Sequence, residues 1–247
     1  MIHQTLSGPL VRDADIPTNE DVRIINSLKN PPPVPVSEKD IFMRHCRLAG
    51  DSIDGYFGCF RTEDLPKLLS MVQGAPLLIG HNKRSLGVAR FFGGTIEEHD
   101  GSKYIVPSFY WLRGHSSADD LRVAIDGGLY SEASISFAYE KPTCSVCGED
   151  IRTCEHLPGS AHGDDGNPVF YYYDNVVAVL EGSLVYRGAQ PGTGFSLSSM
   201  LSDSENPTYG TPILRIKRHG KWYRAPLIEE NPDSEPPVTQ PSQPASV

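Results

Sequence analysis

The chain has 247 residues, of which 38% are hydrophobic, and its formal net charge is -9 at pH 7. A negative charge of this size argues against broad electrostatic binding to nucleic acid or to an anionic membrane surface. No run of about 18 apolar residues occurs, and the N-terminus lacks a basic flank followed by an apolar core, so neither a transmembrane helix nor a secretory signal is predicted. We therefore expect a cytosolic protein whose partners are proteins.

Composition divides the chain into a folded centre and polar ends. Residues 1–40 contain a run of prolines and predict an extended arm with one short amphipathic turn, which either wraps a neighbour or stays unattached. Residues 41–200 predict the folded domain, interrupted at residues 140–167 by a polar insertion that contains cysteines. Residues 201–225 are a C-terminal extension. Residues 226–247 are acidic and proline-rich, so they predict a disordered tail.

The first half of the folded domain alternates helix and strand signals. Thr62 and the acidic residues after it predict a helix start, because a side-chain oxygen and negative charge complement the free amides of a first turn. The apolar run at residues 76–79 then predicts a buried strand that ends at His81. Two apolar segments, residues 86–92 and 103–110, are joined by a polar turn and predict a hairpin.

The second half of the domain is dominated by strand patterns. Residues 116–126 predict a second helix, whose apolar residues, including Val123, are expected to pack inward. Residues 129–139 follow, and from residue 132 onward polar and apolar side chains alternate as in a half-buried strand. Residues 169–173 and 175–186 predict two more strands, the second nearly all apolar.

Three polar residues at these strands suggest a chemistry. Ser134 lies on the polar face of its strand, His81 at the end of another, and Glu181 inside an apolar one. A serine hydroxyl is a weak nucleophile that needs a base within hydrogen-bond reach and a third group to orient that base. Spacing alone favours a structural explanation: a serine bonded to a neighbouring strand, a surface histidine and a glutamate paired with an arginine. A buried carboxylate nevertheless needs a partner.

The order of these segments and their local sequences favour the catalytic explanation over the structural one. The run Leu-Ile-Gly-His ends at His81, Ala-Ser-Ile-Ser-Phe contains Ser134, and Leu-Glu-Gly-Ser-Leu-Val contains Glu181. Together they resemble the caudovirus prohead protease family, the capsid-maturation serine peptidases, over roughly residues 50–195. The resemblance implies that Ser134 is the nucleophile, His81 the base and Glu181 the acidic member of a triad.

The sequence departs from the family pattern at two positions. Ser136 stands where the family usually has Gly, which makes it a rival nucleophile on the same strand face, and Gly182 stands where the family usually has Val. Ser131 and Ser183 are weaker rivals for the nucleophile. Asp174 is the fallback for the acidic position.

The resemblance also implies a fold and a biological role. The implied fold is α+β but mostly β: an antiparallel β-barrel flanked by helices, as in herpesvirus assemblins. The implied substrates are the phage scaffold protein and the N-terminal arm of the major capsid protein, cut inside an assembling prohead in the host cytoplasm, and self-association is expected. The alternative is a catalytically inactive relative that serves as a structural or assembly protein of the head. Backbone amides after Ser134 are expected to bind the oxyanion, assisted by Arg187 or Arg90.

The insertion predicts a zinc site of its own. Cys144 and Cys147 are separated by two residues, which lets both thiolates reach one ion, and Cys154 with His156 would complete a tetrahedral Cys3His set. His162 is the alternative fourth ligand, and a disulfide is the rival interpretation. Four protein ligands leave no position for a catalytic water, so the zinc is expected to be structural.

Nucleic-acid binding is the second class of function to weigh. The insertion carries more acidic than basic residues, which is the wrong sign for phosphate contacts and suits protein docking better. Residues 215–224 form a basic stretch with two aromatics, but a solvated strand explains them equally well. Nucleic acid is therefore an unlikely partner.

Overall fold

The structure is a computed structural model that describes residues 2–162, 166–186, 189, 213–218 and 221–226. The chain divides into two compact units, Met1–Asn206 and Pro207–Val247. The first contains all of the predicted site residues. Among the described residues, none of the helices has the length and apolarity needed to cross a bilayer.

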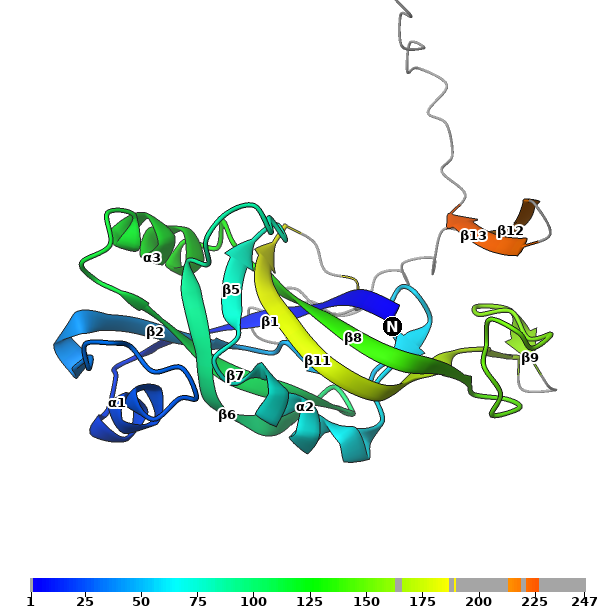
Figure 1. Cartoon of the computed structure of the whole chain (residues 1–247), viewed down its shortest axis with the longest axis horizontal. Coiled ribbons are helices and arrows are strands. Elements are labelled where there is room, and N and C mark those ends of the chain that lie inside the picture. The colour runs from blue at the N-terminus through cyan, green and yellow to red at the C-terminus, as the bar shows by residue number, and fades with distance from the viewer. Residues whose placement is uncertain (1, 163–165, 187–188, 190–212, 219–220, 227–247) are drawn as a thin grey trace, which may run out of the picture. The chain divides into compact units, whose positions relative to one another are not determined.

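The first unit is built on a nine-stranded sheet (Figure 1). Its strands are β1 (Ile2–Asp15), β2 (Ile41–Cys46), β3 (Ala49–Gly50), β4 (Gly58–Cys59), β5 (Pro76–Ile79), β6 (Ala89–His99), β7 (Ser102–Leu112), β8 (Glu132–Cys144) and β11 (Tyr171–Val185). The helices are α1 (Asn19–Asn26), α2 (Leu65–Val72) and α3 (Ala118–Asp126), with 3-10 turns at Glu38–Asp40 and Thr62–Asp64. A separate small hairpin joins β9 (Ala161–His162) to β10 (Asn167–Pro168).

The sheet is mixed rather than purely antiparallel. Its strand order is β2-β1-β8-β11-β5-β6-β7-β3, and β2 also pairs with β7. Most neighbours are antiparallel, but β11 runs parallel to both β4 and β5. The prediction of a mostly β fold with few helices is thus confirmed, while the expectation of an antiparallel sheet is wrong at these two pairings.

The alternation in β8 determines which face of the sheet is the core. Ala133, Ile135, Phe137 and Tyr139 are at most 2% exposed and belong to the main hydrophobic cluster. The ring centroids of Phe137 and Phe60 are 4.8 Å apart. Because successive side chains of a strand point to opposite faces, the serines of β8 lie on the face away from this cluster.

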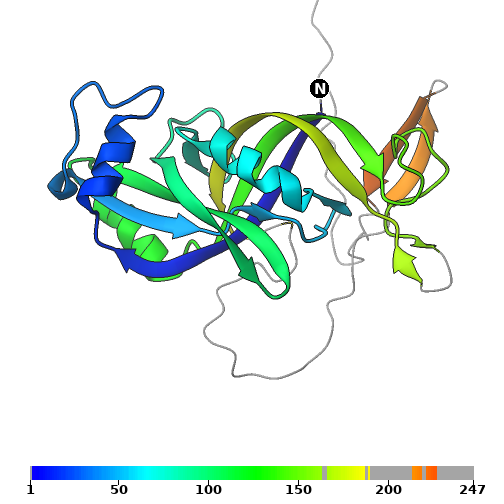
Figure 2. The same ribbon diagram turned by 90° about the horizontal axis from the view of Figure 1, so that it is seen from below.

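The helices pack as their patterns require, with two differences in detail. α2 buries Leu65, Leu68 and Val72 and lies against the sheet (Figure 2). Thr62 does not cap it, because α2 begins only at Leu65 and Asp64 occupies the N-cap position; the Thr62 hydroxyl donates to Asp51 at 2.7 Å. α3 buries one stripe, but Val123 is 55% exposed, so the expectation that it packs inward is wrong.

The N-terminal segment is not an arm. The first part of β1, through Pro9, pairs with β8, and the part from Leu10 onward pairs with β2. Pro9 therefore falls where β1 changes partner, a place where a strand tolerates the missing amide hydrogen. α1 follows, with Thr18 and Asp21 forming a capping box.

One strand replaces the two that were expected over residues 169–186. β11 is continuous from Tyr171 to Val185, and Asn175, which lies within it, has a positive φ of 57°. β8 likewise continues to Cys144, so the insertion begins five residues later than its polar composition indicated.

The second unit contains a single described hairpin. β12 (Ile213–Arg218) pairs antiparallel with β13 (Lys221–Pro226), so the basic stretch forms strands. The predicted disordered tail, apart from Pro226, lies outside the described residues.

A buried carboxyl in the first unit predicts a pH-dependent stability. Asp54 is 1% exposed and accepts hydrogen bonds from the Tyr173 hydroxyl at 2.5 Å and from the amides of Tyr56 and Gly58. Burial raises the pKa of Asp54 to about 6, and the hydrogen bonds offset only part of that rise. Between about pH 4 and about pH 6 the folded state therefore keeps a proton that the unfolded chain, with a carboxyl pKa of about 3.9, has released.

As the pH rises from about 4 to about 6, the stabilisation that comes from this proton is lost, and we expect the free energy of unfolding to fall by up to about 3 kcal/mol. Urea unfolding across this range, for the wild type and for Asp54→Asn, measures the contribution. The variant keeps the shape of the side chain but cannot ionise, so this part of the pH dependence should disappear. Parallel curves for the two proteins would contradict the assignment.

Candidate active site and metal centre

Three strands that are distant in the sequence meet at the candidate active site. Ser134 lies on β8, Glu181 on β11, and His81 just after β5. β11 is the common neighbour, since it pairs antiparallel with β8 and parallel with β5. In this register Ser183 of β11 lies opposite both Ser134 and Leu78, which brings the end of β5 next to the polar face of β8.

A tight turn after β5 directs His81 over that face. Gly80 and His81 both have positive φ, 59° and 54°, a conformation that Gly adopts freely and that other residues adopt only when the surroundings hold them there. Two hydrogen bonds hold the turn. The Gly80 amide donates to the Leu184 carbonyl at 2.8 Å, and the His81 amide donates to Ser183 Oγ at 2.8 Å.

The imidazole of His81 connects the serine to the carboxylate. Its Nε2 lies 2.8 Å from Ser134 Oγ, and its Nδ1 lies 2.7 Å from Glu181 Oε1. An ionised carboxylate only accepts hydrogen bonds, so Nδ1 carries the proton that faces Glu181. In the neutral ring this leaves Nε2 as an acceptor for the Ser134 hydroxyl, which is the arrangement a general base requires.

The Glu181 carboxylate is buried, and its contact at the site is the His81 ring. The Glu181 side chain is 3% exposed, whereas that of His81 is 25% exposed and forms the open edge of the site. The second oxygen, Oε2, is buried without a hydrogen-bond partner among the described residues. His81 is therefore the partner that this buried charge has, rather than the arginine of the structural explanation.

A β-bulge in β11 places Glu181 on the polar face. Val179 lies opposite Phe137, but the next pair is Glu181 with Ser136, so the register shifts by one residue. Val179 packs against the core cluster, as does Phe137. Without the shift, the strict alternation of a strand would send Glu181 to the core as well.

The rival residues have other partners. Ser136 Oγ accepts a hydrogen bond from Lys83 Nζ at 3.4 Å, whereas the His81 ring bonds to Ser134. Ser183 supports the His81 turn through its Oγ. Asp174, the fallback acid, binds Arg61 with both carboxylate oxygens, at 2.7 and 3.0 Å. Ser131 precedes β8 and has no described contact with the triad.

The positioning role of Ser183 and the place of Lys83 were not anticipated from the sequence. The only signals were that Ser183 follows Glu181 by two residues on one strand face, and that Lys83 follows His81 by two residues in a loop.

The glycine that departs from the family pattern has a packing reason. A Cβ at Gly182 would lie 2.4 Å from Phe91 Cε2 and 2.5 Å from Phe91 Cζ. Phe91 is fully buried in the core. The aromatic ring therefore occupies the space that a valine at position 182 would need.

Among the described residues, the expected oxyanion groups do not lie at the site. Ile135 is paired on both sides, with Leu6 of β1 and with Gly182 of β11, so its amide faces a neighbouring strand. Arg90 binds the carbonyls of Gly74 and Asn30, and it pairs with Pro76 at the opposite end of β5 from His81. Arg187 lies outside the described residues.

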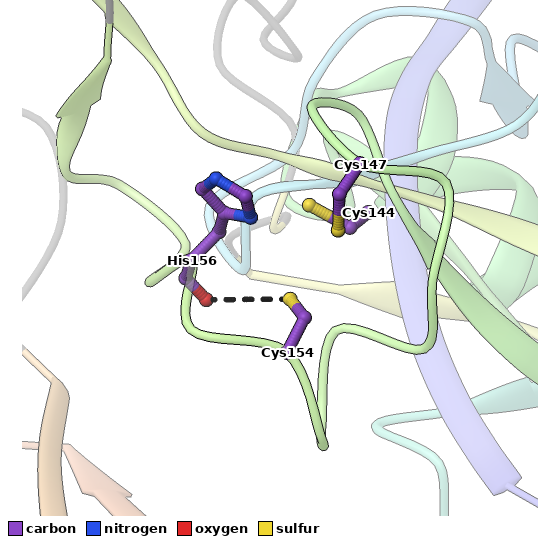
Figure 3. Close-up of side chains that lie close together, drawn as sticks. All are labelled: Cys144, Cys147, Cys154 and His156. Atoms are coloured by element: carbon purple, nitrogen blue, oxygen red, sulfur yellow. Dashed lines mark hydrogen bonds between the residues drawn. The ribbon is translucent and has the colours of Figure 1, made fainter.

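The insertion brings four metal-ligand side chains together (Figure 3). The ligand atoms of Cys144, Cys147, Cys154 and His156 all lie within 4.8 Å of one another. The Val146 amide donates to Cys144 Sγ at 3.4 Å, and all five cysteines of the chain are free thiols. The cluster could hold a metal ion such as zinc, and the rival disulfide is not formed.

An orphaned ring nitrogen supports this fit. His156 Nδ1 is buried without a hydrogen-bond partner among the described residues, although a buried polar atom normally has one. The ring of His162 lies edge-on against His156, with centroids 5.1 Å apart, and His162 is not a member of the cluster. His156 is therefore the fourth ligand that the geometry favours.

The loop is also anchored to the core. Ile151, within the polar insertion, and Val169, just after it, are at most 2% exposed and join the main hydrophobic cluster. Cys144 ends β8 and pairs with Tyr171, the first residue of β11. The metal-ligand cluster thus lies where β8 ends and β11 begins.

No protein-family model, curated protein or solved structure matches the chain.

Proposed function

We propose that the chain is a serine endopeptidase in which Ser134 is the nucleophile, His81 the general base and Glu181 the group that orients the imidazole. The observation that carries this proposal is the pair of hydrogen bonds through His81, 2.8 Å to Ser134 and 2.7 Å to Glu181. Both lie within the range needed for proton transfer and for orientation.

The proposed reaction follows from the tautomer. As Ser134 Oγ bonds to the scissile carbonyl carbon, its proton moves to His81 Nε2, and Glu181 stabilises the imidazolium that forms. Collapse of the tetrahedral intermediate expels the amine, which takes the proton from His81. Water then attacks the acyl-enzyme by the same path and releases the second product.

The proposed substrates are the scaffold and the N-terminal arm of the major capsid protein of a tailed phage, cut inside the prohead by a self-associating enzyme. Two features support this class. The three motif segments occur in the order that the prohead protease family has. In addition, β2 pairs with both β1 and β7, a pairing that suits the β-barrel of that family.

In this proposal the metal cluster holds a structural zinc. Three thiolates and one imidazole match the ligands and the coordination number that zinc prefers, and they leave no open position for a water. The ion would fix the loop between β8 and β11, and the acidic surface of that loop suits docking to proteins.

Co-expression tests the proposal. The chain is produced with the scaffold and major capsid proteins of the genome that encodes it, and their sizes are followed by electrophoresis and intact mass. We expect defined fragments with the wild type and full-length proteins with Ser134→Ala. A fluorophosphonate probe, which forms a covalent bond only with an activated serine, should label the wild type at Ser134.

Ser70→Ala is the matched control, because Ser70 is exposed on α2 and a serine is again changed to alanine. It should cleave and label as the wild type does. Cleavage that persists in Ser134→Ala would rule out Ser134 as the nucleophile. Labelling of Ser134 without cleavage would show that the serine is activated but that the scaffold and major capsid proteins are not its substrates.

A further inference from the structure

Among the described residues, the expected donors are not placed to stabilise the oxyanion of the proposed mechanism. The negative charge that develops on the scissile carbonyl oxygen needs hydrogen-bond donors aimed at it, and such donors are among the largest contributions to catalysis in hydrolases. The Ile135 amide faces a neighbouring strand, and Arg90 lies at the far end of β5.

Lys83 is the cation that the fold brings next to the nucleophile. Its Nζ lies 3.4 Å from Ser136 Oγ. Ser134 and Ser136 share one face of β8, and residues two apart on a strand are separated by about 7 Å. A carbonyl oxygen bound between the two serines would therefore lie within reach of the Lys83 ammonium.

The turn that fixes the general base also fixes Lys83. The Lys83 amide donates to the His81 carbonyl at 2.8 Å, so the two residues belong to one hydrogen-bonded turn. Lys83 itself is exposed, and an ammonium has three donors, of which Ser136 uses one. Two donors remain for a ligand that enters from solvent.

Ser136 accounts for the direction of the lysine. Ser136 is 2% exposed and pairs with Glu181 next to the bulge, so its hydroxyl is a fixed acceptor on the floor of the site. A glycine there, as in the resembling family, would leave the ammonium without this contact. Ser136 thus positions the ammonium of Lys83.

We propose that Lys83, positioned by Ser136, donates a hydrogen bond to the oxyanion of the tetrahedral intermediate. This inference rests on the proposed peptidase function and adds a catalytic residue to it. When Ser134 Oγ bonds to the carbonyl carbon, the electron pair of the broken π bond moves to oxygen, and Lys83 stabilises the charge without giving up its proton. The pair returns when the leaving group departs.

The test compares Lys83→Met, Lys83→Arg and Ser136→Gly with the wild type in hydrolysis of p-nitrophenyl acetate. This ester passes through the same oxyanion but needs no peptide recognition. We expect Lys83→Met to lower kcat by about 10²- to 10³-fold with KM nearly unchanged, because the interaction forms only in the transition state. Lys83→Arg should restore part of the loss, and Ser136→Gly should lower kcat less than Lys83→Met does.

Arg84→Met is the matched control, because it removes an exposed positive charge from the neighbouring residue. It should keep kcat within about two-fold of the wild type, as most exposed substitutions do. Equal losses in Arg84→Met and Lys83→Met would show a general charge effect and overturn the assignment.

The rate at which fluorophosphonate labels Ser134 gives a second readout, since the phosphoryl oxygen occupies the place of the oxyanion. Labelling should slow in Lys83→Met in parallel with kcat. If Lys83→Met keeps the wild-type kcat while Ser134→Ala is inactive, the lysine inference fails and the peptidase proposal stands. If the wild type neither hydrolyses the ester nor reacts with the probe, both fail.

Discussion

Replacing Ser134 with alanine is expected to lower kcat for peptide hydrolysis by about 10⁴- to 10⁶-fold, and His81→Ala should lower it by about as much. The reason is that the two groups act as one unit. Nε2 lies 2.8 Å from Oγ, and the nucleophile gains its reactivity only by transferring a proton to that nitrogen. Single-turnover kinetics on a defined scaffold fragment would measure both losses.

The double variant distinguishes a triad from three independent contributions. Ser134→Ala combined with His81→Ala should be no less active than either single variant, since removing one member already disables the unit. Multiplicative losses would contradict the proposed roles. Circular dichroism should show that each variant stays folded, because both side chains lie outside the core cluster.

Removing the metal is expected to have the largest effect on stability. Purified protein should contain about one zinc per chain, and Cys144→Ser should lack it, because a structural zinc needs all of its ligands. We expect chelation or this substitution to lower the melting temperature by at least about 10 °C, since structural zinc sites contribute on the order of 10 kcal/mol. Metal analysis and calorimetry measure the two effects.

Cys59→Ala is the control for the loss of a thiol. Cys59 is buried in β4 and is not part of the cluster, so its replacement should cost some packing energy but leave the zinc content unchanged. Wild-type zinc content in Cys144→Ser would contradict the assignment. A chelator that leaves the melting temperature unaltered would show that the loop is held by its core contacts alone.

Much of the site could be predicted because the local pattern and the fold agree there. The alternation in β8 identified the polar face that carries Ser134, and the short apolar run of β5 correctly placed His81 at the end of a strand. In both cases burial of one set of side chains determines where the other set points. The cysteine spacing likewise identified the four residues of the metal-ligand cluster.

The remainder depends on pairing partners that no local pattern encodes. Pro9 suggested an arm, yet it lies where β1 leaves β8 for β2. Residues 169–173 and 175–186 suggested two strands, yet a single strand continues through Asn175, whose φ is positive. Ser183 and Lys83 acquire their roles only through the turn at His81, which brings together residues about 100 positions apart.

The bulge after Val179 constrains how the length of β11 can vary. Because Leu180 is the extra residue of the register shift, deleting it would restore strict alternation and leave Glu181 opposite Ser136, with its carboxylate still on the polar face. If Leu180 were kept but the bulge were lost, Leu180 would take the place opposite Ser136 and the Glu181 carboxylate would turn into the hydrophobic interior, away from His81. Functional homologues and engineered versions should therefore either keep the extra residue together with its bulge or lack both, because one without the other reverses the face on which the carboxylate lies.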